Sequence, residues 1–265
     1  MNKPKVISFS SGKGGVGKTS FVANLGKLWS KAGKKTLLID GDWALGKLSL
    51  TLGVRPQWTV DSVLSEKVSI HQAVEPVAEN LSLLAAPSGI MGLEELSEGQ
   101  RNHIFFEIET LVNDYDLVLF DHSSGIHWSV LQFAAASHEQ VIVTTPEPTS
   151  YTDAYAIMKI LSKRFSVKEF SLLVTMSHNR AETEKIITQF ANVARMHLGV
   201  RIHVLDIFPW EPNVSASIRS QKLFVDSYPI HGFTHQLSKV REALDDHVST
   251  ATGGLNFAYT GESAR

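Results

Sequence analysis

The sequence contains no cysteine, which excludes disulfide bonds and thiolate metal sites throughout the chain. It also lacks an apolar run near the roughly 18 residues that a membrane-spanning helix requires, and its first apolar run is too short for a signal peptide. The formal net charge is −2, so neither sign of charge is in clear excess. The composition therefore carries no electrostatic signature of a nucleic-acid binder. We therefore expect a cytoplasmic protein with a hydrophobic core.

Short apolar runs alternate with helix-like stretches along the 265 residues. The apolar runs are continuous, which is typical of strands buried on both faces of a parallel sheet with helices between them. We therefore predict an α/β fold with a mostly parallel central sheet flanked by helices, as one domain over 1–248 with a loose tail at 249–265. The expected strands are 6–9, 36–40, 81–85, 116–121, 140–145, 170–174 and 201–205, and the expected helices include 18–31, 101–113 and 150–164.

A glycine-rich segment, SSGKGGVGKTS, follows the first expected strand at residues 10–20. Gly12, Gly14 and Gly17 have the spacing G-x-G-x-x-G between a strand and a helix, and Asp40 ends the next strand about twenty residues later. This pattern is typical of a dinucleotide site, in which the acid binds a ribose hydroxyl.

The same segment also fits the P-loop pattern, in which Gly12 and Gly17 precede Lys18 and Thr19. In such a loop the backbone N–H groups surround the phosphates, the lysine reaches the β and γ oxygens, and the hydroxyl binds Mg²⁺. A buried ammonium at the start of a helix is costly unless an anion meets it. A glycine turn without a ligand therefore does not explain Lys18.

Residues later in the chain decide between the two patterns. Asp121 follows the apolar run LVLF at 117–120, where a P-loop enzyme needs a second acid for the Mg²⁺ shell. Gly125 stands where an N–H group would meet the γ-phosphate. A dinucleotide enzyme explains neither of these residues, nor Lys18 and Thr19. We therefore predict a nucleoside triphosphate site and keep the dinucleotide site as the minor alternative.

Lys13 is one lysine more than an ordinary P-loop requires. With it, the segment KGGVGKT at 13–19 resembles the deviant P-loop of the MinD/ParA family of ATPases. In this family the extra lysine reaches the phosphates of the partner subunit, as an arginine finger supplied in trans does. The resemblance implies a three-layer P-loop NTPase fold, ATP or ADP and Mg²⁺ as cofactors, slow ATP hydrolysis, and a homodimer that forms around ATP.

The resemblance also implies roles for individual residues. The segment LLIDGDWALGKLSL at 37–50 is similar to the family's switch I, in which Asp42 orients the attacking water and Asp40 lies near the magnesium. The catalytic residues implied are Lys13, Lys18 and Asp42, and the metal-site residues are Thr19, Asp42 and Asp121. Pro209 is expected beside the adenine and Glu147 on the ribose side. The nucleotide-binding residues implied are Gly12, Gly14, Gly15, Val16, Gly17, Lys18, Thr19, Ser20, Gly125, Glu147, Thr175 and Pro209.

The chain departs from the family's pattern near this site. Thr175 stands where the family usually has an asparagine that reads the adenine edge, and a hydroxyl does not offer the amide's donor and acceptor pair. Lys47 replaces the usual asparagine in switch I, His122 replaces the usual threonine in switch II, and the bulky Trp43 follows Asp42. These changes leave open the base selectivity and the rate of hydrolysis.

Four further segments resemble the FlhG branch of the family, which regulates flagellar number. They are APSGI at 86–90, DHSSGI at 121–126, TTPEPTSYTDAYAIMK at 144–159 and FPWEPNV at 208–214. The resemblance implies flagellar partners, namely the GTPase FlhF, a flagellar transcription regulator or proteins of the flagellar switch complex. It also leaves open a peripheral contact with the inner face of the cell membrane.

The last predicted helix, 231–248, bears on that membrane contact. Its apolar stripe consists of Phe233, Leu237, Val240, Leu244 and Val248, and this stripe favours packing in the core over lipid binding. The tail beyond it has no polybasic segment to attract anionic lipid.

Two other functions stay open. A ParA-type partitioning ATPase needs a basic surface for DNA, and Lys159, Lys163, Arg164 and Lys168 form only a modest basic cluster. The other is a nucleotide-binding adaptor with impaired hydrolysis. The departures at Thr175, Lys47 and His122 keep this function open, whereas the retained Asp42 and Lys13 argue against it.

Overall fold

The computed structural model describes residues 4–43, 45–87 and 96–247 of the chain. Within these ranges the chain forms an eight-stranded sheet in the order β3-β4-β2-β5-β1-β6-β7-β8. Neighbouring strands pair in parallel except β3, which runs antiparallel to β4 at one edge. The strands are β1 Lys5–Ser11, β2 Thr36–Gly41, β3 Val74–Ala78, β4 Leu81–Leu84, β5 Leu117–Ser124, β6 Glu139–Thr144, β7 Glu169–Ser177 and β8 Arg201–Pro209.

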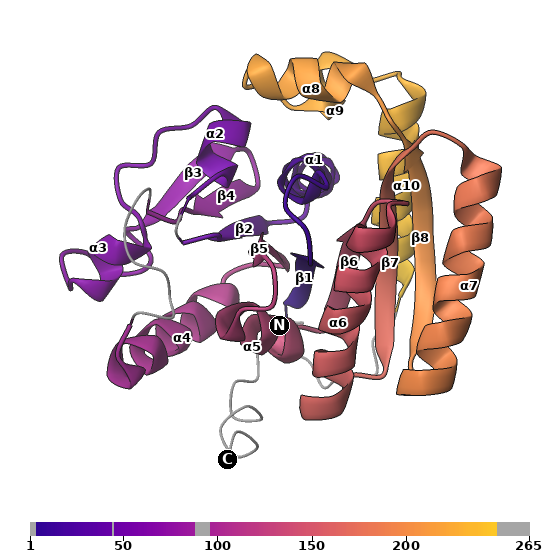
Figure 1. The fold of residues 1–265 in the computed structure, drawn as a ribbon. Coiled ribbons are helices and arrows are strands. Elements are labelled where there is room, and N and C mark those ends of the chain that lie inside the picture. Colours follow the sequence, from indigo (N-terminus) through magenta and orange to yellow (C-terminus); the bar gives the residue numbers. More distant parts are fainter. Residues whose placement is uncertain (1–3, 44, 88–95, 248–265) are drawn as a thin grey trace.

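Helices cover both faces of the sheet, so the fold has three layers (Figure 1). One hydrophobic cluster joins the first face to α1, α2, α9 and α10, and two clusters join the other face to α3, α4, α5, α6 and α7. This is the predicted fold class. The helices are α1 Lys18–Lys31, α2 Leu48–Leu52, α3 Val60–Leu64, α4 Glu98–Val112, α5 Trp128–Ala136, α6 Pro148–Arg164, α7 Arg180–Leu198, α8 Pro212–Arg219, α9 Phe224–Ser227 and α10 Gly232–Asp246.

The sheet brings the predicted acids to one edge. Asp40 of β2 is the register partner of Asp121 of β5, and Asp121 in turn is the partner of Phe9 of β1. The glycine loop begins directly after β1. Because parallel strands end at the same edge of a sheet, the loop and both acids meet there, which is where open α/β sheets bind ligands.

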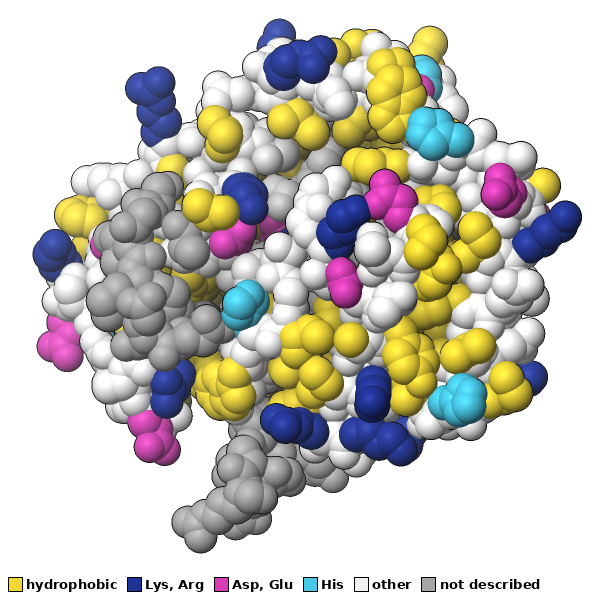
Figure 2. All heavy atoms as spheres, in the orientation of Figure 1, with side chains coloured by type: hydrophobic (Ala, Val, Ile, Leu, Met, Phe, Trp, Pro, Cys, Tyr) yellow, Lys and Arg dark blue, Asp and Glu magenta, His cyan; other side chains and the backbone are white. Residues whose placement is uncertain are grey.

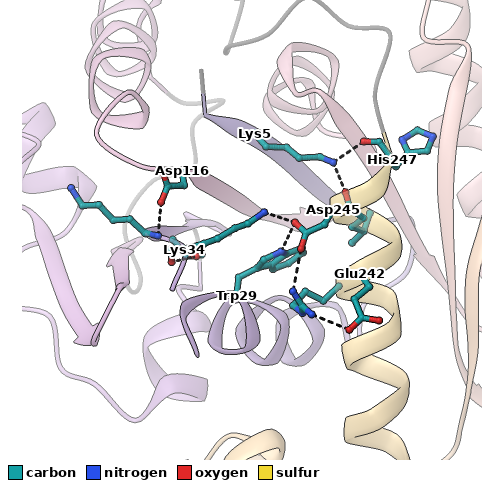
Figure 3. Close-up of polar contacts among 11 residues, drawn as sticks. Lys5, Trp29, Lys34, Asp116, Glu242, Asp245 and His247 are labelled. Atoms are coloured by element: carbon teal, nitrogen blue, oxygen red, sulfur yellow. Dashed lines mark hydrogen bonds and ion pairs between the residues drawn. The ribbon is translucent and has the colours of Figure 1, made fainter. Parts of the chain in front are cut away.

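The last helix packs on the core as its apolar stripe predicts. Phe233, Leu237, Val240 and Leu244 are all buried, whereas Val248 lies outside the described residues. Polar contacts fix the C-terminal end of α10 (Figure 3): the Asp245 carboxylate accepts from Trp29 Nε1 at 2.9 Å and from Lys34 Nζ at 2.6 Å. These contacts tie α10 to α1 and to the segment that precedes β2.

The sequence prediction found the seven parallel strands and the helices α1, α4, α6 and α10 to within a few residues at each end. It missed the edge strand β3, which contains Pro76 and lacks a continuous apolar run. It also gave no bounds for α5 and α7. The predicted tail at 249–265 lies outside the described residues.

No helix in the described ranges has the length and apolar character needed to cross a bilayer. Figure 2 shows one face of the molecule, on which basic side chains gather at the lower edge, below the end of α6 in Figure 1. Lys163 and Arg164 lie in the last turn of α6. Elsewhere on this face basic, acidic and hydrophobic side chains are interspersed.

Candidate functional site

The glycine loop connects β1 to α1 and leaves the N-terminus of that helix open to a ligand. Gly15 and Gly17 have left-handed backbone angles, with φ of 80° and 87°, which favour glycine. Gly17 is the N-cap of α1 and supplies no side-chain cap to the first N–H groups. Free N–H groups at a helix N-terminus form a binding site for phosphate.

Gly12 lies where the start of the glycine loop closely approaches α6. A Cβ atom built on Gly12 would lie 2.3 Å from the Cβ of Asp153 on α6. No side chain fits in that space, so the loop position depends on glycine. This contact sets the start of the loop against α6, and sequence reasoning did not identify Asp153.

Lys18, Thr19 and Asp121 form a buried polar cluster under the loop. The Lys18 ammonium donates to Asp121 Oδ1 at 2.5 Å and to the carbonyl of His122, and the Thr19 hydroxyl donates to Asp121 Oδ2 at 2.6 Å. Lys18 is 8% exposed and Asp121 1% exposed. The structure therefore brings together the lysine, the hydroxyl and the acid that the P-loop pattern predicts.

Asp40 organises the start of switch I. Its two carboxylate oxygens accept from the backbone N–H groups of Asp42 and Leu48, at 3.0 and 2.8 Å. Burial, and next the negative charge of Asp121, raise the pKa of Asp40 to about 7. Asp40 thus holds the backbone at Asp42 and at Leu48 close to the site.

Asp42, the acid expected to orient the attacking water, forms an ion pair with Lys47 of the same switch I segment. Its Oδ2 lies 2.9 Å from the ammonium of Lys47, and Asp42 is 8% exposed. Trp43, the bulky residue that follows, is buried in the hydrophobic cluster beside β2 and β4. The tryptophan therefore anchors switch I in the core, while Lys47 meets the charge of the acid.

His122 lies fully inside the protein directly after Asp121. Burial, and next the nearby Lys18 ammonium, lower the pKa of His122 to about 3, so the ring is neutral. Its ring stacks on Phe120 with centroids 5.7 Å apart. A neutral imidazole packed on Phe120 adds no positive charge to the site.

The N–H group of Gly125 is engaged within the protein. It donates to the carbonyl of Ser11 at 2.9 Å, and Gly125 has a φ of 102°. A Cβ atom on Gly14 would lie 3.5 Å from the hydroxyl oxygen of Ser124. Switch II therefore lies against the loop, and the N–H group that the resemblance assigns to the γ-phosphate is bonded to Ser11 in this structure.

Lys13 and Glu147 form an ion pair on the surface of the site. The Lys13 ammonium donates to Glu147 Oε2, and the two side chains are 43% and 62% exposed. Glu147 is also the N-cap residue of α6. The extra lysine of the loop is thus held within its own subunit by an exposed contact.

An apolar pocket adjoins the loop at the start of α1. Its inner wall includes Phe21, Phe208 and Phe233, whose rings make edge and tilted contacts at centroid distances of 4.7 to 5.8 Å. Trp210 lines the pocket as well and is 53% exposed. The predicted residues that line this pocket are Val16, Gly17, Ser20, Thr175 and Pro209. Its position and aromatic lining suit a nucleobase.

The hydroxyl of Thr175 is used to hold the loop. It donates to the carbonyl of Val16 at 2.8 Å and to that of Thr144 at 3.2 Å. Its donor is therefore not directed at a base. Sequence reasoning missed Phe21, Phe208 and Trp210, because the ring residues that share one pocket lie on elements far apart in the chain.

The donor set under the loop fits Mg²⁺. This ion prefers oxygen ligands, keeps several water molecules, and is bound by one or two protein groups with substrate phosphates. Thr19 and Asp121 offer a hydroxyl and a carboxylate that lie 2.6 Å apart. Asp40 is the register partner of Asp121 and lies beside this pair of oxygen donors.

Comparisons with known proteins place the chain in a family. The family described as an AAA domain matches residues 4–171. The antiactivator FleN of Pseudomonas aeruginosa is 27% identical over 229 residues, which cover 86% of this chain and 82% of FleN. The flagellum site-determining protein YlxH of Helicobacter pylori is 28% identical, covering 97% of this chain and 86% of YlxH.

A septum site-determining protein and a solved structure extend the likeness. The putative MinD of Guillardia theta is 32% identical over 240 residues, which cover 87% of this chain and 86% of that protein. MinD of Pyrococcus horikoshii, solved as a complex with Mg-ADP, superposes with a TM-score of 0.74 at 22% identity. That match covers 92% of this chain and 96% of the archaeal chain, and it shows the same fold.

Proposed function

The chain belongs to the AAA-domain family, in its MinD/ParA branch of P-loop ATPases, and from that premise we propose that it is a switch controlling the number or placement of flagella. Its cofactors are ATP or ADP and Mg²⁺. The observation that carries the proposal is the buried cluster of Lys18, Thr19 and Asp121 beneath a loop that also contains Lys13. The flagellar role rests on the likeness to YlxH, a flagellum site-determining protein.

Each site residue has a proposed part in binding or hydrolysis. The loop N–H groups and Lys18 bind the β- and γ-phosphates, and Thr19 and Asp121 hold Mg²⁺ through its ligand shell. When bound, the ion neutralises charge that develops on the phosphates. Asp42 orients the attacking water once Lys47 releases it. The aromatic pocket of Phe21, Phe208 and Trp210 binds the base.

The switch depends on contacts that ATP binding has to exchange. Lys13 leaves Glu147 to reach the phosphates of a second subunit, so the charge around the γ-phosphate is completed only in the dimer. The Gly125 N–H group leaves Ser11 to meet the same phosphate. Both exchanges tie the dimer surface to the presence of the γ-phosphate. Partners of the ATP state, which we infer to be flagellar, then bind a surface that the monomer does not present.

Size-exclusion chromatography with light scattering tests the switch. An Asp42→Ala protein is expected to hold ATP unhydrolysed and to dimerise with Mg-ATP but not with Mg-ADP. Adding Lys13→Ala to it is expected to abolish the dimer while ATP still binds. A monomer in both nucleotides, with binding verified by calorimetry, would overturn the dimer switch and leave a nucleotide-binding adaptor. For the flagellar role, a deletion strain that swims with a normal number of flagella would overturn that part.

A further inference from the structure

A group of two histidines and a carboxylate lies at the edge of the sheet opposite the nucleotide site. Glu169 begins β7, His203 lies near the start of β8, and His247 is the C-cap residue of α10. One ligand atom from each of the three lies within 4.8 Å of the other two. Three elements distant in the chain thus present metal-ligand side chains to one point.

His203 has a ring nitrogen that the described part of the protein leaves unsatisfied. Its Nε2 atom is buried and has no hydrogen-bond partner among the described residues. The nearest acid is Glu169, whose Oε2 lies 3.9 Å away, beyond hydrogen-bond distance. A buried polar atom without a partner is destabilising, so this nitrogen has a physical reason to bind a further group.

A second carboxylate orients the other histidine. Glu139 is 3% exposed, and its Oε2 lies 2.7 Å from His247 Nδ1. Its Oε1 accepts from the hydroxyl of Ser171, which fixes the carboxylate. A histidine held by a carboxylate at Nδ1 directs Nε2 outward with its lone pair available, and this arrangement is usual for metal-binding histidines.

We propose that Glu169, His203 and His247 bind a Zn²⁺ ion, with Glu139 as the positioning residue behind His247. Two imidazole nitrogens and one carboxylate oxygen are a usual zinc ligand set, with a fourth position for water. Arg201 Nη1 holds the other oxygen of Glu169 at 2.9 Å, which leaves Oε2 to face the cluster. The nitrogen ligands disfavour Mg²⁺, which prefers oxygen.

The geometry needs a small adjustment to close around an ion. Ligands at bonds of about 2.1 Å in a tetrahedral shell lie about 3.4 Å apart, so the side chains have to approach by about an ångström. The two histidine rings already make a T-shaped contact, with centroids 5.0 Å apart. The ion would join the end of α10 to β7 and β8, next to the point where Lys5 Nζ donates to the carbonyl of His247 at 2.8 Å (Figure 3).

Calorimetric titration of untagged full-length protein with Zn²⁺ tests the proposal. Saturating Mg-ADP is present throughout, so that Mg²⁺ fills the nucleotide site. We expect one Zn²⁺ ion per chain, and a loss of at least tenfold in affinity for His203→Ala and for His247→Ala. Glu139→Gln is expected to weaken binding by about 10- to 100-fold, as removal of an outer-shell carboxylate usually does.

The matched control is His197→Ala, which removes an exposed histidine of α7 and is expected to leave Zn²⁺ affinity unchanged. Each variant is first shown to bind ADP as the parent does, so that misfolding is detected separately. Co²⁺ titration adds a visible spectrum that should disappear in His203→Ala. Absence of Zn²⁺ binding, or equal affinity in all four variants and the parent, would mean that the group is only a set of ion pairs and would overturn the proposal.

Discussion

The ammonium of Lys47 lies 2.9 Å from Oδ2 of Asp42, so the acid that should orient the attacking water is paired within switch I. Lys47 is half exposed at its side chain, whereas that of Asp42 is 11% exposed. The backbone N–H group of Asp42 is meanwhile fixed by Asp40. Switch I therefore holds its acid through both the side chain and the backbone.

Replacing Lys47 with asparagine should raise the rate of ATP hydrolysis. The substitution removes the cation that competes for the Asp42 carboxylate. Because the Lys47 side chain is half exposed, we take the pair to contribute about 0.2–1 kcal/mol, and we expect an increase of up to about fivefold. Phosphate release in single turnover measures the effect. Lys67→Asn removes an exposed lysine elsewhere as a control. A slower Lys47→Asn protein would mean that Lys47 assists hydrolysis.

Replacing Lys18 alone should destabilise the protein without nucleotide, besides preventing ATP binding. Asp121 is 1% exposed and would keep its charge with no ammonium beside it, which costs about 3–5 kcal/mol for a buried pair. The double variant Lys18→Met with Asp121→Asn removes both charges and should recover most of the free energy of unfolding. Urea unfolding of the parent, both single variants and the double variant measures the coupling. Additive effects would contradict a buried pair.

Asp40 and His122 have pKa shifts of opposite direction, and these contribute opposite pH dependences to the stability of the protein without Mg²⁺. Asp40 has its pKa raised from 3.8 to about 7, so it takes up a proton on folding, and its contribution to stability is lost as pH rises through that window. His122 has its pKa lowered from 6.5 to about 3, so its contribution is lost as pH falls from 6.5. Between about pH 4 and 6.5 the two slopes oppose each other.

Single variants should reveal each slope. With His122→Gln, only Asp40 remains, and the free energy of unfolding should rise as pH falls from 7, by up to about 1.4 kcal/mol per pH unit. With Asp40→Asn, it should fall by a similar amount per unit as pH falls from 6.5. Urea unfolding at a series of pH values, in chelator and without nucleotide, measures both. Parallel curves for the two variants would contradict the opposed shifts.

Trp210 should report binding of the nucleobase. It lines the aromatic pocket and is 53% exposed, whereas Trp29 and Trp43 are buried at 0% and 4% exposure. ADP binding should therefore change tryptophan fluorescence through Trp210, and Trp210→Phe should remove most of the change with little loss of affinity, because the ring is retained. Trp58→Phe, on the far hydrophobic cluster, is the control. An unchanged signal in Trp210→Phe would place the base elsewhere.

The sequence predicts the P-loop side of the site well because its chemistry is local. Lys18 and Thr19 are fixed by the loop pattern, and Asp121 follows from the end of a buried apolar strand. The parallel sheet then requires these residues to share one edge, and register pairs Asp40 with Asp121. No long-range contact has to be guessed for this part of the fold.

Contacts that depend on packing between distant elements were not predictable in the same way. Gly12 approaches Asp153 closely, and the rings of Phe21 and Phe208 share one pocket. The residues of each pair are far apart in the chain, and nothing in the sequence indicates that they are in contact. The hydroxyl of Thr175 illustrates the same limit. The resemblance places it beside the base, and Thr175 does line the pocket, but its hydroxyl donates to the carbonyl of Val16.

Lys13 and Glu147 define the last prediction, which concerns the strength of the ATP-bound dimer. Their ion pair lies within one subunit and is exposed on both sides, so breaking it costs at most about 1 kcal/mol. If Lys13 has to leave Glu147 to act on a second subunit, Glu147 competes with the phosphates of that subunit for the Lys13 ammonium. Glu147→Gln removes this competing carboxylate. In the Asp42→Ala background with Mg-ATP, the dimer should then form up to about fivefold more tightly for each lysine released.

Sedimentation velocity over a range of protein concentrations measures this dissociation constant. Glu184→Gln is the matched control, because it removes an exposed ion pair with Arg180 on α7 and should leave the dimer unchanged. Lys13→Ala combined with Glu147→Gln should be as defective as Lys13→Ala alone, because without Lys13 the glutamate has no lysine to restrain. A weaker dimer in Glu147→Gln would instead mean that Glu147 contributes a contact of its own in the ATP state, and the ion pair would then not restrain dimerisation.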